Sequence, residues 1–353
     1  MAVFQLPNLS PEILLRFSPT PLDFINRRRI NFFRPLSAIG DSQSVAPDSE
    51  SRNRMFILGM GFVGGFFAQQ LKEANWVVSG TCRSDPKKKE WEKRGINLHP
   101  FSADSPEWSL LLDSVKDYTH LLISIPPLAD IGDPMLRNVE LLRGKLSSGN
   151  LRWLCYLSST SVYGDCGGAW VDENHPPNPK TQSAKVRLAA EEGWLSLGRD
   201  LGVSTQILRL GGIYGPGRSA IDTLLKQERL SEGQKRRASR KFTSRVHVED
   251  ICQVLQASTE KPSSGEIYNV VDDDPAPREE VFEYALELIA KRWPEIINTK
   301  PFPFLYESRE ESSLRGEKRV RNEHMKNKLG VKLIYPSYKS GLQSIVENMD
   351  NPF

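Results

Sequence analysis

The chain has little cysteine and histidine and no long hydrophobic segment. Its 353 residues include four cysteines and five histidines. Cys82, Cys155, Cys166 and Cys252 show no close pairing and no accompanying histidine cluster. These absences argue against a zinc site or a disulfide framework and favour a reducing compartment. No run approaches the roughly eighteen apolar residues that a membrane-spanning helix needs, so we expect no metal centre and no membrane partner.

The sequence also lacks a strong excess of charge of one sign. Its formal net charge is +3, and the first forty residues carry that excess, with five arginines against Glu12 and Asp23. The rest of the chain is electrically balanced, so electrostatics gives no argument for a nucleic-acid partner. The length is sufficient for one large α/β domain, or for a dinucleotide-binding domain with a smaller lobe.

The segment 1–53 differs in composition from the rest of the chain. It contains arginine but no lysine, few acids, and scattered serine and proline. This composition resembles that of an organelle transit peptide, whereas Pro7, Pro11 and Glu12 interrupt the apolar core that a secretory signal needs. We predict chloroplast import, with mitochondrial import as the second choice. A disordered cytosolic extension is the alternative.

A glycine-rich turn follows the first apolar run, Met55 to Leu58, and opens an apolar helix. In the turn GMGFVGG, Gly59 allows a tight bend and Gly61 leaves room for a pyrophosphate beside the backbone. Gly64 allows the helix to approach the sheet closely. The start of the helix, which includes Phe62 and Val63, presents its positive end to the phosphates. The pattern therefore predicts a dinucleotide site, and a glycine-rich turn without a ligand is the alternative.

The end of the second strand, Trp76 to Thr81, indicates which dinucleotide is bound. An acidic residue there would accept hydrogen bonds from the ribose hydroxyls of NAD, but the chain continues with Cys82, Arg83 and Ser84. A guanidinium and small hydroxyls suit a 2′-phosphate, so we predict NADP(H) with Arg83 as the main determinant. The three lysines of 87–89 either assist or form a solvated basic loop.

Further strands and helices alternate along the chain. The predicted strands are Ile96–Phe101, Thr119–Ile125, Leu151–Ser158, Ser204–Leu210 and Ile267–Val271, and the predicted helices are Leu136–Leu146, Ser183–Leu201, Arg278–Arg292 and Ser340–Met349. This alternation predicts an α/β protein with a Rossmann-type doubly wound parallel sheet. We place the dinucleotide-binding core at about 54–210 and a small C-terminal substrate lobe mainly at 211–349.

The charged segment Ser308 to Arg321 is expected to be exposed. Asp104 either accepts from the adenine amino group or caps the next turn.

Several motifs in order resemble the extended short-chain dehydrogenase/reductase family, which includes nucleotide-sugar epimerases and dehydratases. The matching segments are GMGFVG from Gly59, YLSSTSVYG at Tyr156–Gly164, LRLGGIYGPG at Leu208–Gly217, RVHVEDI at Arg245–Ile251 and EIYNVVDDDP at Glu266–Pro275. The resemblance implies a nicotinamide cofactor. It also implies a catalytic tyrosine, a lysine four residues later, and a serine or threonine that orients the substrate oxygen.

The chain keeps the serine of this set but not the tyrosine. Ser159 matches the family serine. If Lys185 is the family lysine, Thr181 stands at the tyrosine position, whereas alignment on LAAE places Arg187 at the lysine and Ser183 at the tyrosine. Neither hydroxyl can replace a phenol in acid–base chemistry near neutral pH. The sequence therefore predicts an atypical member in which Ser159 and Lys185 are the candidate catalytic residues.

Two functions fit these observations. The first is an NADP(H)-dependent oxidoreductase or epimerase-like enzyme with an unrecognised proton donor, acting on a small-molecule or nucleotide-linked substrate. A basic loop from Lys235 to Arg245 either clamps substrate phosphates or is solvated surface. The second is an NADP(H)-binding sensor or scaffold without turnover. Tyr163 and Tyr214 are interpreted as packing or substrate-contact residues and His247 as structural, and the resemblance implies a homodimer.

Overall fold

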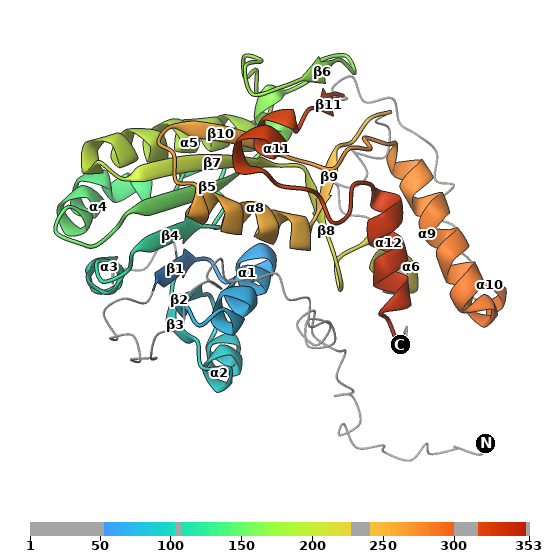
Figure 1. Ribbon diagram of the computed structural model, residues 1–353, viewed down its shortest axis with the longest axis horizontal. Coiled ribbons are helices and arrows are strands. Elements are labelled where there is room, and N and C mark those ends of the chain that lie inside the picture. Colours follow the sequence, from blue (N-terminus) through green and yellow to red (C-terminus); the bar gives the residue numbers. More distant parts are fainter. Residues whose placement is uncertain (1–52, 103–107, 227–240, 300–316, 351–353) are drawn as a thin grey trace, which may run out of the picture.

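A seven-stranded parallel sheet forms the centre of the molecule (Figure 1). The computed structural model describes residues 53–102, 108–226, 241–299 and 317–350. The strands, in spatial order, are β3 (Asn97–Pro100), β2 (Val77–Cys82), β1 (Arg54–Leu58), β4 (His120–Ile123), β5 (Trp153–Ser159), β7 (Ser204–Leu210) and β10 (Glu266–Val270). The order reverses between β1 and β4, which is where doubly wound sheets bind their ligands. All seven predicted strands are present, and the predicted fold class is confirmed.

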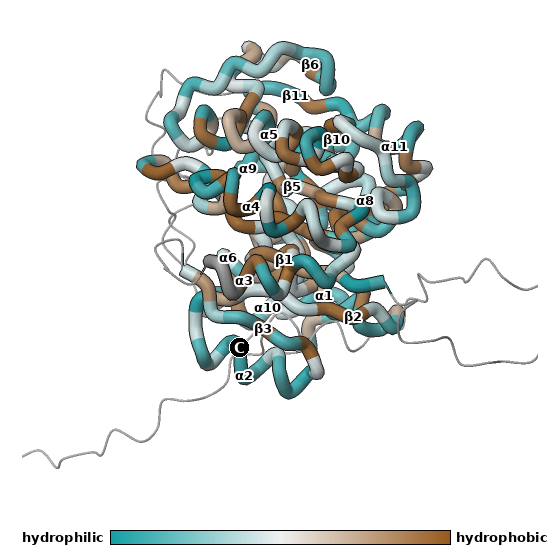
Figure 2. The backbone as a smooth tube through the Cα atoms, turned by 90° about the vertical axis from the view of Figure 1, so that its left-hand side faces the viewer, coloured by the Kyte–Doolittle hydropathy of each residue, from teal (hydrophilic) through white to brown (hydrophobic). Residues whose placement is uncertain are grey.

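Helices cover both faces of this sheet. One face carries α1 (Phe62–Glu73), α2 (Asp85–Lys93), α8 (Val248–Glu260) and α11 (Glu323–Leu329), and the other carries α3 (Trp108–Val115), α4 (Val139–Leu146) and α5 (Gln182–Leu201). Along β1, Met55 and Ile57 join the first core while Phe56 and Leu58 join the second. The apolar run is therefore buried on both sides, as a central parallel strand requires. Hydrophobic segments accordingly gather along the sheet in Figure 2, while α2 is mainly hydrophilic.

A smaller helical lobe stands beside the sheet (Figure 1). It contains α6 (Ala220–Lys226), α9 (Arg278–Arg292), α10 (Pro294–Thr299) and α12 (Tyr338–Glu347), which share a hydrophobic core. The chain enters the lobe after β7, through β8 (Gly212–Tyr214), which pairs with β9 (Arg245–His247). Because α8 and β10 return to the central sheet, a boundary at residue 210 separates core from lobe only approximately.

Two sequence-based expectations about charged segments were wrong. The lysines of 87–89 lie on helix α2 and not in a loop. In the described part of the segment predicted to be exposed, Glu317, Lys318 and Val320 are buried. The strand β11 (Arg319–Val320) pairs there with β6 (Trp170–Val171). The Nζ of Lys318 donates to the backbone carbonyl of Gly164 at 3.0 Å. A hydrogen bond of this kind reduces the cost of burying a charged side chain.

Candidate functional site

The glycine turn is anchored to the end of β2. Gly59 has a φ of +97°, a conformation that other residues rarely adopt. Its N–H donates to Thr81 Oγ1 at 2.8 Å, and the N–H of Met60 donates to the Thr81 carbonyl, also at 2.8 Å. A Cβ atom at Gly64 would lie 2.5 Å from the Gly59 carbonyl oxygen. The tight bend at Gly59 and the close approach at Gly64 therefore both depend on glycine.

Gly61 differs from the other two glycines because its surroundings are open. A Cβ atom there would meet a single atom within 4 Å, the Gly59 carbonyl oxygen at 3.9 Å. Gly61 caps α1, whose first turn has neither a side-chain cap nor an acidic residue. The first N–H groups of the helix, at Phe62 and Val63, thus lack a side-chain acceptor at the cap. Val63 is buried, so only its backbone is placed to contact a ligand. This is the arrangement that binds a diphosphate at a helix N-terminus.

At the carboxyl end of β2 the side chains change from buried to exposed. Thr81 and Cys82 are buried, whereas Arg83 and Ser84 are exposed. Arg83 forms no hydrogen bond or ion pair with another described residue. Ser84 stands at the N-cap of α2 without capping it through its side chain. Both side chains are therefore available to a ligand, whereas Asp104 lies outside the described residues.

Side-chain hydrogen bonds stabilise the carboxyl end of β5 and the turn that follows it. Ser159 is half-buried, and its Oγ accepts from the Ser161 N–H at 3.1 Å. Its neighbour Ser158 is buried and donates to the Glu191 carboxylate. This turn presents Ser159 at the carboxyl edge of the sheet, the same edge as the glycine turn.

The start of α5 supplies the residues at the positions of the family tyrosine and lysine. Thr181 is the N-cap, and its Oγ1 accepts from the Ala184 N–H at 3.3 Å. Ser183 and Lys185 are exposed. Arg187 is half-buried and donates to the carbonyl of Leu157 on β5 at 3.4 Å. Of the two alternative alignments, the one with Arg187 at the lysine position places a cation against β5, whereas Lys185 has no such contact.

Tyr163 is a structural residue in a closed network. Its hydroxyl donates to Asn269 Oδ1 at 2.8 Å and accepts from Arg209 Nη1 at 3.0 Å. The side chain is fully buried, and burial raises the pKa of the phenol. These contacts leave Tyr163 unsuited to proton transfer with a substrate.

His247 and Tyr214 belong to a buried aromatic cluster. His247 Nδ1 accepts from the Glu249 N–H at 3.3 Å, and burial lowers the pKa of His247 to about 3. Its ring lies 5.1 Å from that of Tyr214 and 4.1 Å from that of Tyr335. Burial also raises the pKa of Tyr214 well above its ordinary value. The expected structural role of His247 fits this geometry.

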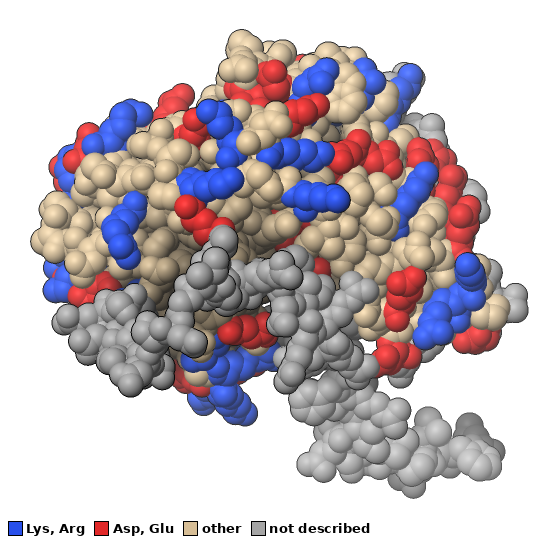
Figure 3. Space-filling model, viewed as in Figure 1, with Lys and Arg blue, Asp and Glu red and all other residues tan. Residues whose placement is uncertain are grey.

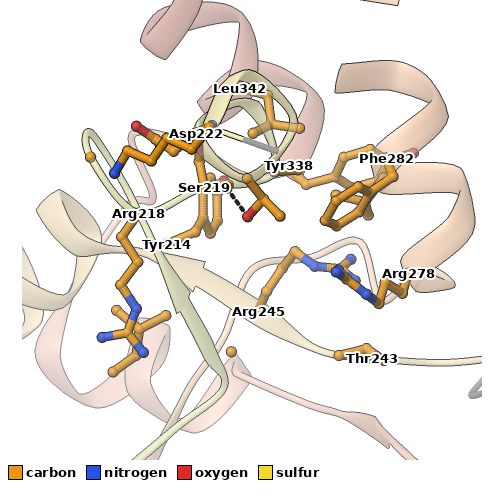
Figure 4. A pocket seen from close by; sticks show the side chains of 17 residues that line it. Tyr214, Arg218, Ser219, Asp222, Thr243, Arg245, Arg278, Phe282, Tyr338 and Leu342 are labelled. Carbon is orange, nitrogen blue, oxygen red and sulfur yellow. Dashed lines mark hydrogen bonds between the residues drawn. The ribbon is translucent and has the colours of Figure 1, made fainter. Parts of the chain in front are cut away.

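The lobe contains a pocket of about 330 Å³ between the β8–β9 pair and helices α6, α9 and α12 (Figure 4). It adjoins the glycine turn, because the Arg218 guanidinium lies 5.4 Å from the centre of the Phe62 ring. Of the basic loop expected to bind phosphates, Lys241 and Arg245 fall within the described residues, and Arg245 lines the pocket. Sequence reasoning missed Arg218 and Arg278, although Arg218 directly follows the motif GGIYGPG.

Other classes of site find no support in the described part of the chain. No group of three or more His, Cys, Asp or Glu side chains there is arranged to hold a metal ion. No helix among the described residues is both long and apolar enough to cross a membrane. On the face shown in Figure 3, acidic and basic side chains are interspersed over the described residues.

Known proteins share the motifs and the fold. Residues 134–271 match the family model of the NAD-dependent epimerase/dehydratase family. Protein YeeZ of Escherichia coli K12 is 31% identical over 223 residues, covering 62% of this chain and 77% of that protein. A functionally unknown conserved protein from Silicibacter pomeroyi has 32% identity and a TM-score of 0.68, over 85% of this chain and 100% of the other. UDP-glucose 4-epimerase from Thermotoga maritima has a TM-score of 0.65 at 16% identity, over 84% of this chain and 98% of the other. This last likeness concerns the fold alone.

Proposed function

Because the chain belongs to the NAD-dependent epimerase/dehydratase family, we propose that it is an NADP(H)-binding oxidoreductase or epimerase-like enzyme. The proposal is supported mainly by the open space beside Gly61 in the glycine turn. In addition, Arg83 and Ser84 follow β2 where an NAD-binding protein would have an acidic residue. The N–H groups at the start of α1 would hold the diphosphate, and the space at Gly61 fits its close approach. The bound nicotinamide would accept or donate a hydride.

The preference for the phosphorylated cofactor rests on Arg83. Its exposed guanidinium has no partner among the described residues, and a guanidinium binds phosphate through two parallel hydrogen bonds. The first acid after β2 is Asp85, at the start of α2, where a carboxylate is stabilised by the helix dipole. Ser84 is the second residue placed to contact the 2′-phosphate. The nicotinamide end would lie toward Ser159, whose hydroxyl would orient the substrate oxygen.

Titration of two variants tests this assignment. Loss of charge-assisted hydrogen bonds costs about 1.5–3 kcal/mol, so R83A should weaken NADPH binding by about 10- to 100-fold and leave NADH binding unchanged. The matched control is K93A, which removes an exposed cation from the far end of α2 and should alter neither affinity. Tighter binding of NADH than of NADPH by the wild-type protein would remove Arg83 from this role.

The missing tyrosine favours a second function, NADP(H) binding without turnover. Thr181 is engaged as a helix cap, Ser183 is an alkyl hydroxyl, and the hydroxyl of Tyr163 is held by protein partners. If micromolar NADPH is never consumed in the presence of a panel of carbonyl compounds and sugar nucleotides, a sensor or scaffold is favoured. A turnover that S159A abolishes would instead establish the enzyme.

A further inference from the structure

The walls of the lobe pocket differ in character. Val281, Phe282 and Leu342 contribute apolar surface from α9 and α12. Across from them are Thr243, which precedes β9, and Arg245, its first residue. Figure 4 shows Phe282 and Leu342 on one side of the cavity, and the side chains of Arg245 and Arg278 extending toward one another. The pocket thus combines an apolar side with a strongly polar one, as ligand sites commonly do.

Two polar atoms on the polar side have no hydrogen-bond partner among the described residues. These are Thr243 Oγ1 and Arg245 Nη1, and both atoms are buried. The Arg245 residue exposes only 8% of its surface, and its other terminal nitrogen, Nη2, donates to the Ala276 carbonyl at 2.9 Å. Leaving a buried polar atom unpaired costs about 1–3 kcal/mol, and native proteins retain few such atoms. A ligand that accepts from Arg245 and bonds to Thr243 would account for both.

Positive charge predominates around the cavity. The basic residues that line it are Arg218, Lys226, Arg245 and Arg278, and the one acidic residue in the described lining is Asp222. The Asp222 carboxylate already accepts from Ser219 Oγ at 2.5 Å. Arg278 lies over the Phe282 ring, with its guanidinium carbon 3.7 Å from the ring centre. Stacking of this kind fixes the plane of a guanidinium.

The side chain of Arg245 forms no hydrogen bond or ion pair with a carboxylate in the described part of the chain, and Asp272 does not hydrogen-bond to its guanidinium. Asp272 interacts electrostatically with Arg245, but its two carboxyl oxygens are buried without hydrogen bonds. Burial raises the pKa of Asp272 well above its ordinary value and lowers the pKa of Arg245. Burial also lowers the pKa of Arg218. An anion in the pocket would favour the charged form of both arginines.

We propose that this pocket binds the carboxylate or phosphate-monoester end of a compact substrate, held by Arg245 and Thr243. The inference rests on the proposed function, since it names the substrate class of the same enzyme. Arg218 lines the pocket and lies over Phe62 at the start of α1. A substrate anchored at Arg245 therefore extends along Arg218 toward the dinucleotide.

The volume of the cavity limits the size of this substrate. About 330 Å³ lies near the lower end of the usual range for ligand pockets. A pocket of this size suits a small acid or a phosphate monoester.

Calorimetric titrations of the full-length protein test this proposal. The probes are inorganic phosphate, malonate and UDP-glucose, and the variants are T243V and R245Q. T259V is the matched control, because Thr259 Oγ1 donates to Gln256 within α8, outside the pocket. Since Thr243 Oγ1 has no protein partner, T243V should fold as stably as the wild type and decides the test if R245Q does not fold.

We expect phosphate or malonate to bind saturably and the affinity to fall at least about tenfold in T243V and R245Q, with T259V unchanged. UDP-glucose should bind no more tightly than the better small anion. Preferential binding of phosphate assigns a phosphate ester, and preferential binding of malonate assigns a carboxylate. Absence of anion binding, anion affinity unaffected by T243V, or tighter binding of UDP-glucose would overturn the proposal. NADPH affinity should be unchanged in T243V, so failure to bind NADPH would count against the proposed function separately.

Discussion

Two residues of the core, Arg209 and Glu191, form a buried ion pair. Arg209 and Glu191 expose 3% and 1% of their surfaces, and Arg209 Nη2 donates to Glu191 Oε2 at 2.7 Å. Arg209 also donates to Tyr163, and Ser158 donates to Glu191. The pair thereby joins β7, α5 and the turn that carries Ser159. Each partner would leave a buried, uncompensated charge if the other were removed.

We expect E191Q to lower the free energy of unfolding by about 3–5 kcal/mol, because Arg209 would remain charged and buried. Urea denaturation measures this change. The matched control is D200N, which removes one of two exposed partners of Arg143, in a pair whose side chains are 38% and 40% exposed. That substitution should cost less than about 1 kcal/mol. Equal losses in both variants would show that the buried network has no special role.

At the scale of single elements, the turn between β1 and α1 separates a structural glycine from a functional one. A Cβ atom at Gly64 would lie 2.5 Å from backbone, whereas one at Gly61 would lie 3.9 Å from its nearest neighbour. Steric conflict with backbone cannot be relieved by a rotamer change, so α1 would have to move away from β1 in a Gly64 variant. At Gly61 the added methyl group would enter only the space assigned to the diphosphate.

G61A should therefore keep the wild-type melting temperature and lose NADPH affinity at least tenfold, or about 1.4 kcal/mol. G64A should lose about 1–3 kcal/mol of stability as well as affinity, because of overpacking. Thermal unfolding and NADPH titration of both variants measure these effects. Full NADPH affinity in G61A would mean that the diphosphate does not approach this residue.

The sequence predicted elements with strong local signals and missed those that depend on distant partners. All seven central strands were expected, because each is an apolar run bounded by turn residues. The pairing of β6 with β11 was not, since it joins residues about 150 positions apart. The same difference between local and distant signals applies to the residues of the candidate site. Gly59, Gly61 and Gly64 were identifiable from their motif, whereas only the folded chain shows that Arg218 lies over Phe62 and that Arg187 contacts β5.

At the scale of the whole molecule, one apolar side chain stands out on the pair formed by α4 and α5. Leu141 of α4 is 39% exposed and is one of three large hydrophobic residues exposed in the described part of the chain. The family resemblance implies a homodimer, and Leu141 would be covered if two copies met at these helices. We propose that two copies of the chain associate through them. The predicted transit peptide, residues 1–53, lies almost entirely outside the described residues and stays a prediction.

L141E should raise the dissociation constant of this dimer at least about tenfold, because it buries an unpaired carboxylate in the interface. Sedimentation velocity across a concentration series measures the change. L128E is the matched control, since Leu128 is 36% exposed but lies outside both helices, and it should leave the association unchanged. A wild-type protein that stays monomeric throughout the series would contradict the proposed interface.

The central claim is that the backbone from Gly59 to Gly64 holds the diphosphate of NADP(H) while Arg83 meets its 2′-phosphate. A crystal structure of the protein with NADPH tests it most directly. We predict diphosphate oxygens within hydrogen-bond distance of the N–H groups that open α1, and the 2′-phosphate in contact with the Arg83 guanidinium. A dinucleotide bound elsewhere, or one whose 2′-phosphate points away from Arg83, would contradict the account.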